Sequence, residues 1–207
     1  YLTAHPAGTD RPHASILNLD SHDPTRATTA FLPVSNRRLV VHRSAPGHVV
    51  IDLWGYFTGP SAPRSDNGLF VAERPVRIWD SRSTHDPLHP GGSLTRRVAP
   101  DSASAVVLNV TAVGATSSGF LAMDAAGQPR PPTSNLNYRW TEPVAAATLV
   151  RNSTGGVTFW SHAGTHVVVD RLGWFTGGAR PGTAPPDRNP MPPGGKRVLF
   201  VSDSSFA

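Results

Sequence analysis

The sequence predicts an all-β protein, built as β-sandwich repeats of jelly-roll-like form in tandem, with the first copy incomplete. Three observations lead to this fold class. The 207 residues include 19 glycines and 21 prolines, which disfavour long helices because proline lacks a backbone donor and glycine is costly to order. Short runs of alternating apolar and polar residues, separated by Gly and Pro turns, are typical of half-buried strands. An internal repeat then carries the same pattern twice.

The internal repeat consists of two pairs of matching blocks. Residues 1–19 align without gaps with 120–138, and residues 47–59 align with 165–177. The blocks occur in the same order, and both offsets are about 118 residues, which is the size of a whole small β-domain and not of a solenoid unit. Residues shared by the two copies are therefore expected to serve mainly the architecture.

The repeat also predicts the domain boundaries. We expect residues 1–59 to form the C-terminal half of a first β repeat and residues 69–177 to form a complete repeat. The segments 60–68 and 178–195 are expected linkers, because the second in particular contains too much proline and glycine to pack. Residues 196–207 form a new apolar run and are expected to start a further domain.

The strands of the complete repeat follow from alternation and from turn residues such as Pro90-Gly91-Gly92 and Gly155-Gly156. Eight short strands in one small domain favour two packed sheets, with a β-barrel or a trefoil-like arrangement as the alternative. No helix is expected. The predicted strands are 76–80, 94–98, 104–113, 119–124, 134–138, 144–150, 156–161 and 165–175.

Composition excludes several classes of function. The chain has no cysteine, so it has neither a disulfide framework nor a thiolate metal site. The net charge of +5 comes from arginines that stand singly or in pairs, without the basic stripe of a nucleic-acid-binding protein. No apolar run is long enough to span a membrane. No cofactor is expected.

Several segments resemble a repeat of exported proteins from high-GC Gram-positive bacteria (actinobacteria). The matching segments are 75–82 (PVRIWDSR), 105–113 (AVVLNVTAV), 119–121, 130–138 (RPPTSNLNY) and 165–175 (THVVVDRLGWF). Such repeats are accessory modules attached to cell-wall hydrolases, lipases and peptidases. The resemblance implies a secreted or cell-surface, non-catalytic module, serving as a spacer or as a weak binder of cell-wall polysaccharide or peptidoglycan.

The end of the chain resembles the opening of an SGNH/GDSL-type hydrolase. Residues 197–201 (RVLFV) correspond to the first strand of that family, and Ser202-Asp203-Ser204 corresponds to its Gly-Asp-Ser motif, with a serine in place of the glycine. The resemblance implies that Ser204 is a catalytic nucleophile. The alternative function is therefore the N-terminal part of an exported SGNH/GDSL-type esterase or hydrolase.

Aromatic and amide side chains are the candidate ligand-binding residues. Trp54, Tyr56 and Trp174 lie near the ends of expected strands, where exposed rings would stack on sugars; the other interpretation is that they plug the end of the sandwich. Asn137, which recurs as Asn18, offers amide donors and an acceptor to sugar hydroxyls or to nearby loop backbone.

The remaining polar candidates have mainly structural interpretations. Asp80 and Arg82 lie two apart and share one side of a strand, either as a polar binding edge or as an ion pair at the strand end. His166 and Asp170 lie four apart, which on a strand separates them by about 13 Å. That distance is too long for one metal ion, so no metal site is predicted.

Overall fold

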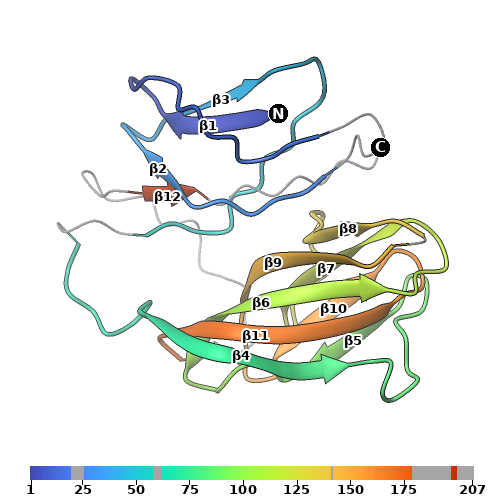
Figure 1. Cartoon of the computed structure of the whole chain (residues 1–207). Helices are drawn as coiled ribbons and strands as arrows, with labels where there is room; N and C mark the ends of the chain where they lie inside the picture. Colours follow the sequence, from blue (N-terminus) through green and yellow to red (C-terminus); the bar gives the residue numbers. More distant parts are fainter. Residues whose placement is uncertain (20–25, 58–61, 141, 179–196, 200–207) are drawn as a thin grey trace. The chain divides into compact units, whose positions relative to one another are not determined.

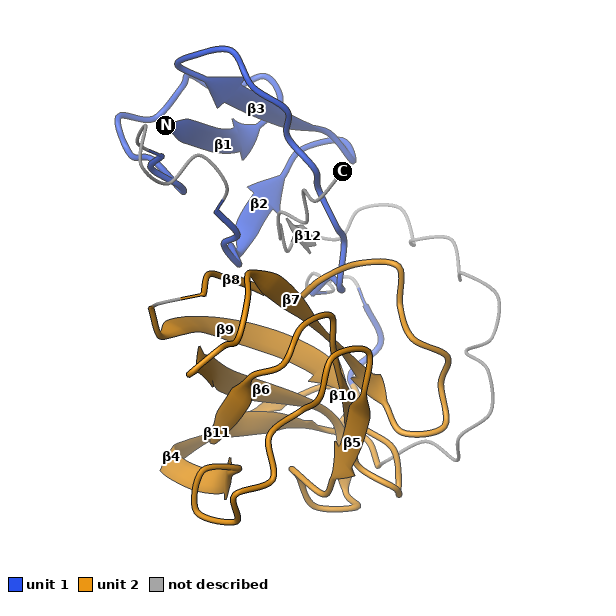
Figure 2. Ribbon diagram, turned by 90° about the vertical axis from the view of Figure 1, so that its right-hand side faces the viewer, with its two compact units in different colours: residues 1–64, 188–207 blue, residues 65–187 orange. Residues whose placement is uncertain are grey.

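The computed structural model describes residues 1–19, 26–57, 62–140, 142–178 and 197–199. These residues form twelve β-strands and no helix, which confirms the predicted all-β class. The chain divides into two compact units, coloured separately in Figure 2. Unit 1 comprises Tyr1–Arg64 and Arg188–Ala207, and unit 2 comprises Ser65–Asp187.

Unit 2 contains two four-stranded antiparallel sheets, ordered β4-β11-β6-β9 and β5-β10-β7-β8 (Figure 1). The chain passes to the other sheet at every connection except the one from β7 to β8, and such alternation is typical of a double-sheet jelly roll. Each strand overlaps one of the eight predicted runs. The strands are β4 (Phe70–Asp80), β5 (Ser93–Arg96), β6 (Ala103–Val113), β7 (Gly119–Ala125), β8 (Leu136–Tyr138), β9 (Val144–Arg151), β10 (Val157–Ser161) and β11 (His166–Thr176).

The core of unit 2 is built from both sheets. Along β6, Val106, Leu108 and Val110 are fully buried and alternate with partly exposed residues, as the period of a strand requires. Phe159 of β10 and Tyr138 of β8 enter the same cluster from the other sheet. The two sheets therefore bury one shared apolar layer, and this burial is the main force that stabilises the unit.

Unit 1 contains four short strands in two two-stranded sheets. β1 (Leu2–Pro6) pairs with β3 (Leu39–Arg43), and β2 (Leu32–Val34) pairs with β12 (Arg197–Leu199). In the part of unit 1 that the structure describes, the buried apolar cluster consists of Ala4 and Leu32 with a few partly buried neighbours.

Aligned residues of the sequence repeat form the same strand pairs in both units. The β1–β3 ladder begins with the pair Leu2–Arg43, and the β7–β10 ladder contains the equivalent pair Leu121–Ser161. These shared registers support the predicted tandem repeat. Two further equivalences are Leu2–Leu17 with Leu121–Leu136, and the turn pair Ser35–Arg38 with Ser153–Gly156.

The repeats differ at their last strand. In unit 2, β11 lies between β4 and β6, whereas the equivalent segment 48–57 of unit 1 is not a strand. The described residues of unit 1 include no strands equivalent to β4 and β6. Segment 48–57 therefore has no neighbouring strand with which to pair. Several of its apolar side chains consequently face solvent, with Leu53 58% and Ile51 44% exposed.

Candidate functional site

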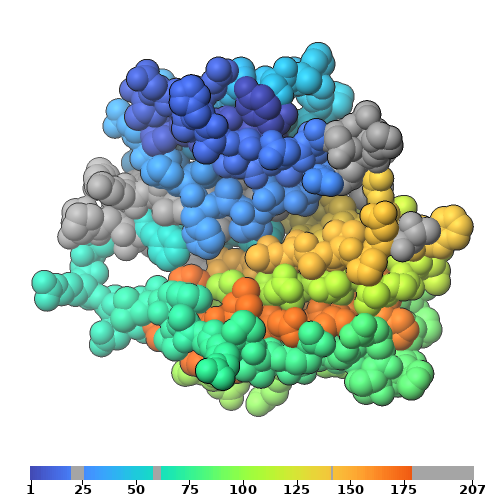
Figure 3. Space-filling view, in the orientation of Figure 1, coloured from blue at the N-terminus to red at the C-terminus, as the bar shows by residue number. Residues whose placement is uncertain are grey.

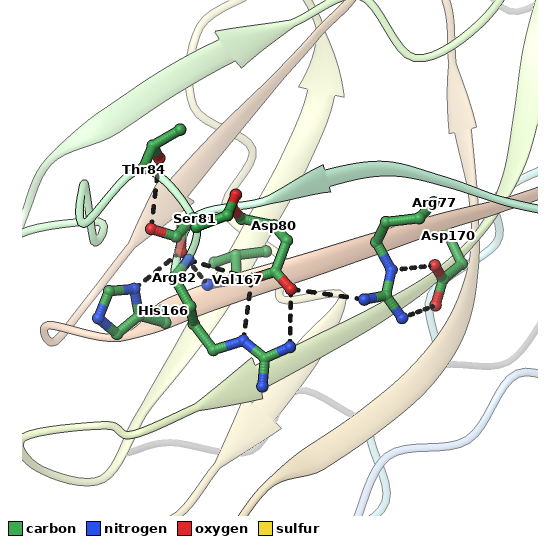
Figure 4. Close-up of polar contacts among 9 residues, drawn as sticks. Arg77, Asp80, Ser81, Arg82, Thr84, His166, Val167 and Asp170 are labelled. Atoms are coloured by element: carbon green, nitrogen blue, oxygen red, sulfur yellow. Dashed lines mark hydrogen bonds and ion pairs between the residues drawn. The ribbon is translucent and has the colours of Figure 1, made fainter.

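The RIWDSR motif lies at the end of β4, beside the start of β11 (Figure 4). The Arg82 guanidinium donates to both carboxylate oxygens of Asp80, at 2.9 and 2.7 Å, and the Arg82 backbone N–H donates to Asp80 Oδ1 at 3.0 Å. Asp80 and Arg82 are only two residues apart, so a tight turn after the strand is enough to close this pair.

A second ion pair joins β4 to β11. Arg77 donates to both oxygens of Asp170, through Nε to Oδ1 and through Nη2 to Oδ2, and its Nη1 lies 3.4 Å from Asp80 Oδ2. Figure 3 shows atoms of β4, β11, β6 and β9 at the surface of this face. The motif thus forms a chain of alternating charges on an exposed sheet face.

The pairing with Arg82 determines the protonation of Asp80. Hydrogen bonds from the Arg82 side chain, opposed by partial desolvation and assisted by the positive charges of Arg82 and Arg77, lower the pKa of Asp80 to about 2. The carboxylate is therefore ionised at neutral pH and already has donors on both oxygens. This arrangement favours the structural ion pair over the polar binding edge.

Ser81 and His166 lie next to this network, and His166 is partly exposed. Ser81 is fully buried. Its Oγ accepts a hydrogen bond from the Val167 N–H at 2.8 Å and lies 3.0 Å from His166 Nδ1. Within the described part of the chain, no carboxylate orients this imidazole, so the pair lacks the accessible nucleophile and the third member of a catalytic triad.

Trp174 lies on the inner side of its sheet, at the end of the layer. The β11 register shifts between Arg171 and Gly173, and Trp174 then pairs with the fully buried Val106. Directly paired residues share a face, so the ring points toward the core and is only partly exposed. The Arg171 guanidinium lies 5.3 Å from the ring centre and binds the Glu73 carboxylate at 2.6 and 2.8 Å.

The other two predicted aromatics belong to unit 1. Tyr56 is 40% exposed, and Trp54 is partly buried. Both lie in segment 48–57, outside any strand. Their expected role as sugar platforms remains a prediction.

Asn137 lies on the outer face of β8, between the buried Leu136 and Tyr138. The neighbouring Asn135 is instead structural: its Oδ1 accepts from the Met123 N–H at 2.7 Å, and its Nδ2 donates to Thr148 Oγ1 at 3.1 Å. The two asparagines of the SNLN segment therefore have different roles, and only Asn137 remains a ligand-binding candidate.

The predicted nucleophile Ser204 lies outside the described residues, as does most of segment 196–207. Residues 197–199 form β12, in agreement with a strand at this point, but β12 pairs with β2 of unit 1. The hydrolase alternative and the further domain both stay predictions.

One cluster was not recognised as a candidate from the sequence. On the outer face of unit 2, the Phe120 ring stacks against His162 with centres 5.0 Å apart, and Arg130 lies 5.1 Å from the same ring. The available signal was the repeat itself, which aligns Arg130 with Arg11.

The described residues contain no group of three side chains able to hold a metal ion, and they include no helix long and apolar enough to cross a membrane. No protein-family model, curated protein or solved structure matches this chain. Fold and site geometry therefore define the class of this protein as all-β, and any assignment of function rests on the site alone.

Proposed function

We propose that this chain is a non-catalytic extracellular repeat module, which acts as a spacer or as a weak cell-wall glycan-binding accessory domain of an exported protein. One observation carries the proposal: Ser81, the hydroxyl partner of the partly exposed His166, is fully buried and already bound by the Val167 N–H, so this Ser–His pair presents no accessible nucleophile.

The charged groups around that pair support the same conclusion. Asp80 is bound by Arg82, and Asp170 is bound by Arg77, so both carboxylates are already neutralised. Catalytic acids and bases need open access to a substrate and a pKa near the working pH, whereas the pKa of Asp80 is lowered to about 2. This network holds β4 against β11 and serves stability.

The shared strand registers support a role in presenting a surface more than once. The strand pairs β1–β3 and β7–β10 share one register, so equivalent positions occur twice along the chain. Linked weak sites act at high effective concentration and bind a polymer more tightly than either site alone. A repetitive polysaccharide is the kind of partner that such an arrangement suits.

The proposal is tested with the full 207-residue chain and purified cell walls from an actinobacterium. We expect co-sedimentation with intact walls if the module binds glycan. We also expect no hydrolysis of p-nitrophenyl acetate above the rate in buffer. Hydrolysis that disappears in the Ser81→Ala variant, while His85→Ala retains it, would contradict the non-catalytic assignment.

The alternative, the front part of an SGNH/GDSL-type hydrolase, is favoured by the β-strand at residues 197–199, where that family has its first strand. It is tested by the same ester assay. Hydrolysis that is lost in Ser204→Ala and retained in Ser205→Ala would support it.

A further inference from the structure

The outer face of the sheet β5-β10-β7-β8 carries four side chains that we call the outer-face cluster: Phe120, Arg130, Asn137 and His162. Phe120 lies between the buried Gly119 and Leu121, so it points away from the core. Asn137 is its direct cross-strand partner. His162 and Arg130 both contact the Phe120 ring, and both are exposed.

Unit 1 carries the same combination of side chains on the equivalent strand pair, β1–β3. Tyr1, Arg11 and Asn18 align with Phe120, Arg130 and Asn137, and the imidazole is supplied by His42. Arg11 Nη1 lies 2.7 Å from His42 Nε2, and the Tyr1 and His42 rings lie 6.3 Å apart. The backbone agrees as well, because the Ser44 N–H donates to the Tyr1 carbonyl as the His162 N–H donates to that of Phe120, both at 3.0 Å.

The histidine of the cluster occupies a different aligned position in each unit, which is not expected of a residue that serves folding alone. His42 aligns with Trp160, and His162 aligns with Ser44, so the imidazole comes from different positions in the two units. It reaches the same aromatic ring in each unit. The cores need neither histidine, since both lie outside the buried clusters.

The two arginines of the cluster also differ from the paired arginines of unit 2. Arg77, Arg82 and Arg171 are each bound to a carboxylate. In the residues that the structure describes, Arg11 and Arg130 form no ion pair with Asp or Glu. In this part of the chain, Arg130 contacts the Phe120 ring and Arg11 contacts His42 Nε2. Neither contact neutralises the positive charge, and each guanidinium keeps N–H groups available to an anion.

These groups define the chemistry of a ligand. The Arg130 guanidinium lies over the Phe120 ring, 5.1 Å from its centre, and a guanidinium can bind a carboxylate or phosphate in bidentate fashion. The aromatic ring offers an apolar surface for a sugar ring. The exposed amide of Asn18 is suited to hydroxyl groups, whereas the Oδ1 atom of Asn137 is buried. We infer that the outer-face cluster, present once in each unit, binds an acidic polysaccharide through its carboxylate or phosphate groups. This inference rests on the proposed glycan-binding function and assigns it to a site other than Trp54, Tyr56 and Trp174.

The test compares two double variants of the full chain that remove the same charge. Arg11→Ala with Arg130→Ala removes the cluster arginines. Arg74→Ala with Arg97→Ala removes two exposed arginines outside it. Binding is measured by isothermal titration calorimetry with polygalacturonate as the carboxylate probe, poly(glycerol phosphate) as the phosphate probe and dextran as the neutral control.

We expect the wild-type chain to bind at least one acidic polymer and not dextran. The cluster variant should lose tenfold or more in affinity, while the control variant stays within twofold. Arg11→Lys with Arg130→Lys keeps the charge but lacks the planar fork, so it should show an intermediate loss. Circular dichroism of each variant checks that the fold is retained.

The acidic polymer that the wild-type chain binds more tightly shows whether the cluster prefers carboxylate or phosphate groups. Equal losses in the cluster and control variants, or equal binding to dextran, would overturn the inference. Binding to intact walls without binding to either acidic polymer would overturn the inference and leave the proposed function standing. Failure to bind walls as well would also remove the glycan-binding role and leave only the spacer.

Discussion

At the scale of single residues, the ion pairs of β4 and β11 link stability to pH. Asp80 and Glu73 both have lowered pKa values, through hydrogen bonds from Arg82 and Arg171 respectively. A carboxylate whose pKa is lower in the folded state than in the unfolded chain stabilises the fold above its unfolded pKa. That contribution disappears as the pH falls through the folded value, which for Asp80 is about 2.

The first prediction concerns the acid limb of the stability curve. The wild-type chain should lose thermal stability between about pH 4 and pH 2, because protonation of Asp80 breaks its pairing with Arg82. Asp80→Asn should be less stable than wild type at pH 7 and should lose less on acidification. Circular dichroism melts at pH 7, 4 and 2 measure this. Asp101→Asn, at a 62% exposed side chain, should keep the wild-type slope; an unchanged slope in Asp80→Asn would contradict the assignment.

Two glycines provide a matched test of backbone packing. Gly156 has φ +97°, and a Cβ there would lie 2.1 Å from the Arg96 carbonyl oxygen. Gly68 has φ +81° and nothing within 4 Å of an added Cβ. Gly68→Ala should therefore lower the free energy of unfolding by only about 1 kcal/mol, the cost of positive φ.

Gly156→Ala should lower the free energy of unfolding by about 4 kcal/mol or more, because the added methyl group meets rigid backbone. Equilibrium urea unfolding gives both values. Equal effects of the two substitutions would show that the close approach of β10 to Arg96 is not tight.

At the scale of elements, the two copies of the last strand share a sequence but differ in structure. Segment 48–57 and β11 both contain the apolar run that follows a histidine. β11 is paired on both edges, by β4 and β6, whereas no strand ladder includes segment 48–57. Neighbouring strands, and not local sequence, decide whether this run becomes a strand.

The aligned valines Val49 and Val167 measure that difference. Val49 is 37% exposed and Val167 is fully buried. Val167→Ala should lower the free energy of unfolding by about 2 kcal/mol, from lost burial and the cavity left behind. Val49→Ala should change it by less than about 0.5 kcal/mol, as expected for a surface site. Chemical denaturation reports both, and a similar cost at Val49 would mean that segment 48–57 is packed in solution.

At the scale of the whole molecule, the two units differ in the size of their cores. Unit 2 buries a cluster that extends across both of its sheets, whereas the buried apolar members of the unit 1 cluster are Ala4 and Leu32. Small cores leave little stability after conformational entropy is subtracted. The units should therefore unfold separately.

Differential scanning calorimetry of the full chain should show a cooperative transition for unit 2 and a weaker transition at lower temperature for unit 1. Val167→Ala should move only the upper transition, because Val167 belongs to the core of unit 2. A single transition, shifted as a whole by Val167→Ala, would indicate that the units are thermodynamically coupled.

The sequence by itself determined the all-β class and the positions of the eight strands in the complete repeat. Alternation along a strand is a local pattern, so it can be recognised without knowledge of the neighbours. The Asp80–Arg82 pair was open to prediction for the same reason, as its partners are two residues apart. The main strand error lies at β4, which begins at Phe70 and not at the predicted residue 76. Glu73, Arg74 and Pro75 interrupt the alternation of apolar and polar residues on which the prediction depended.

Only the tertiary structure decided which distant residues meet. Arg77 and Asp170 are 93 residues apart in sequence and pair because β4 lies beside β11. The register shift in β11 turned Trp174 toward the core, which no local pattern shows. Phe120 and Arg130 lie ten residues apart, whereas His162 follows β10 and meets the Phe120 ring only when β7 and β10 pair. Local periodicity thus specifies strands, whereas strand pairing and register specify sites.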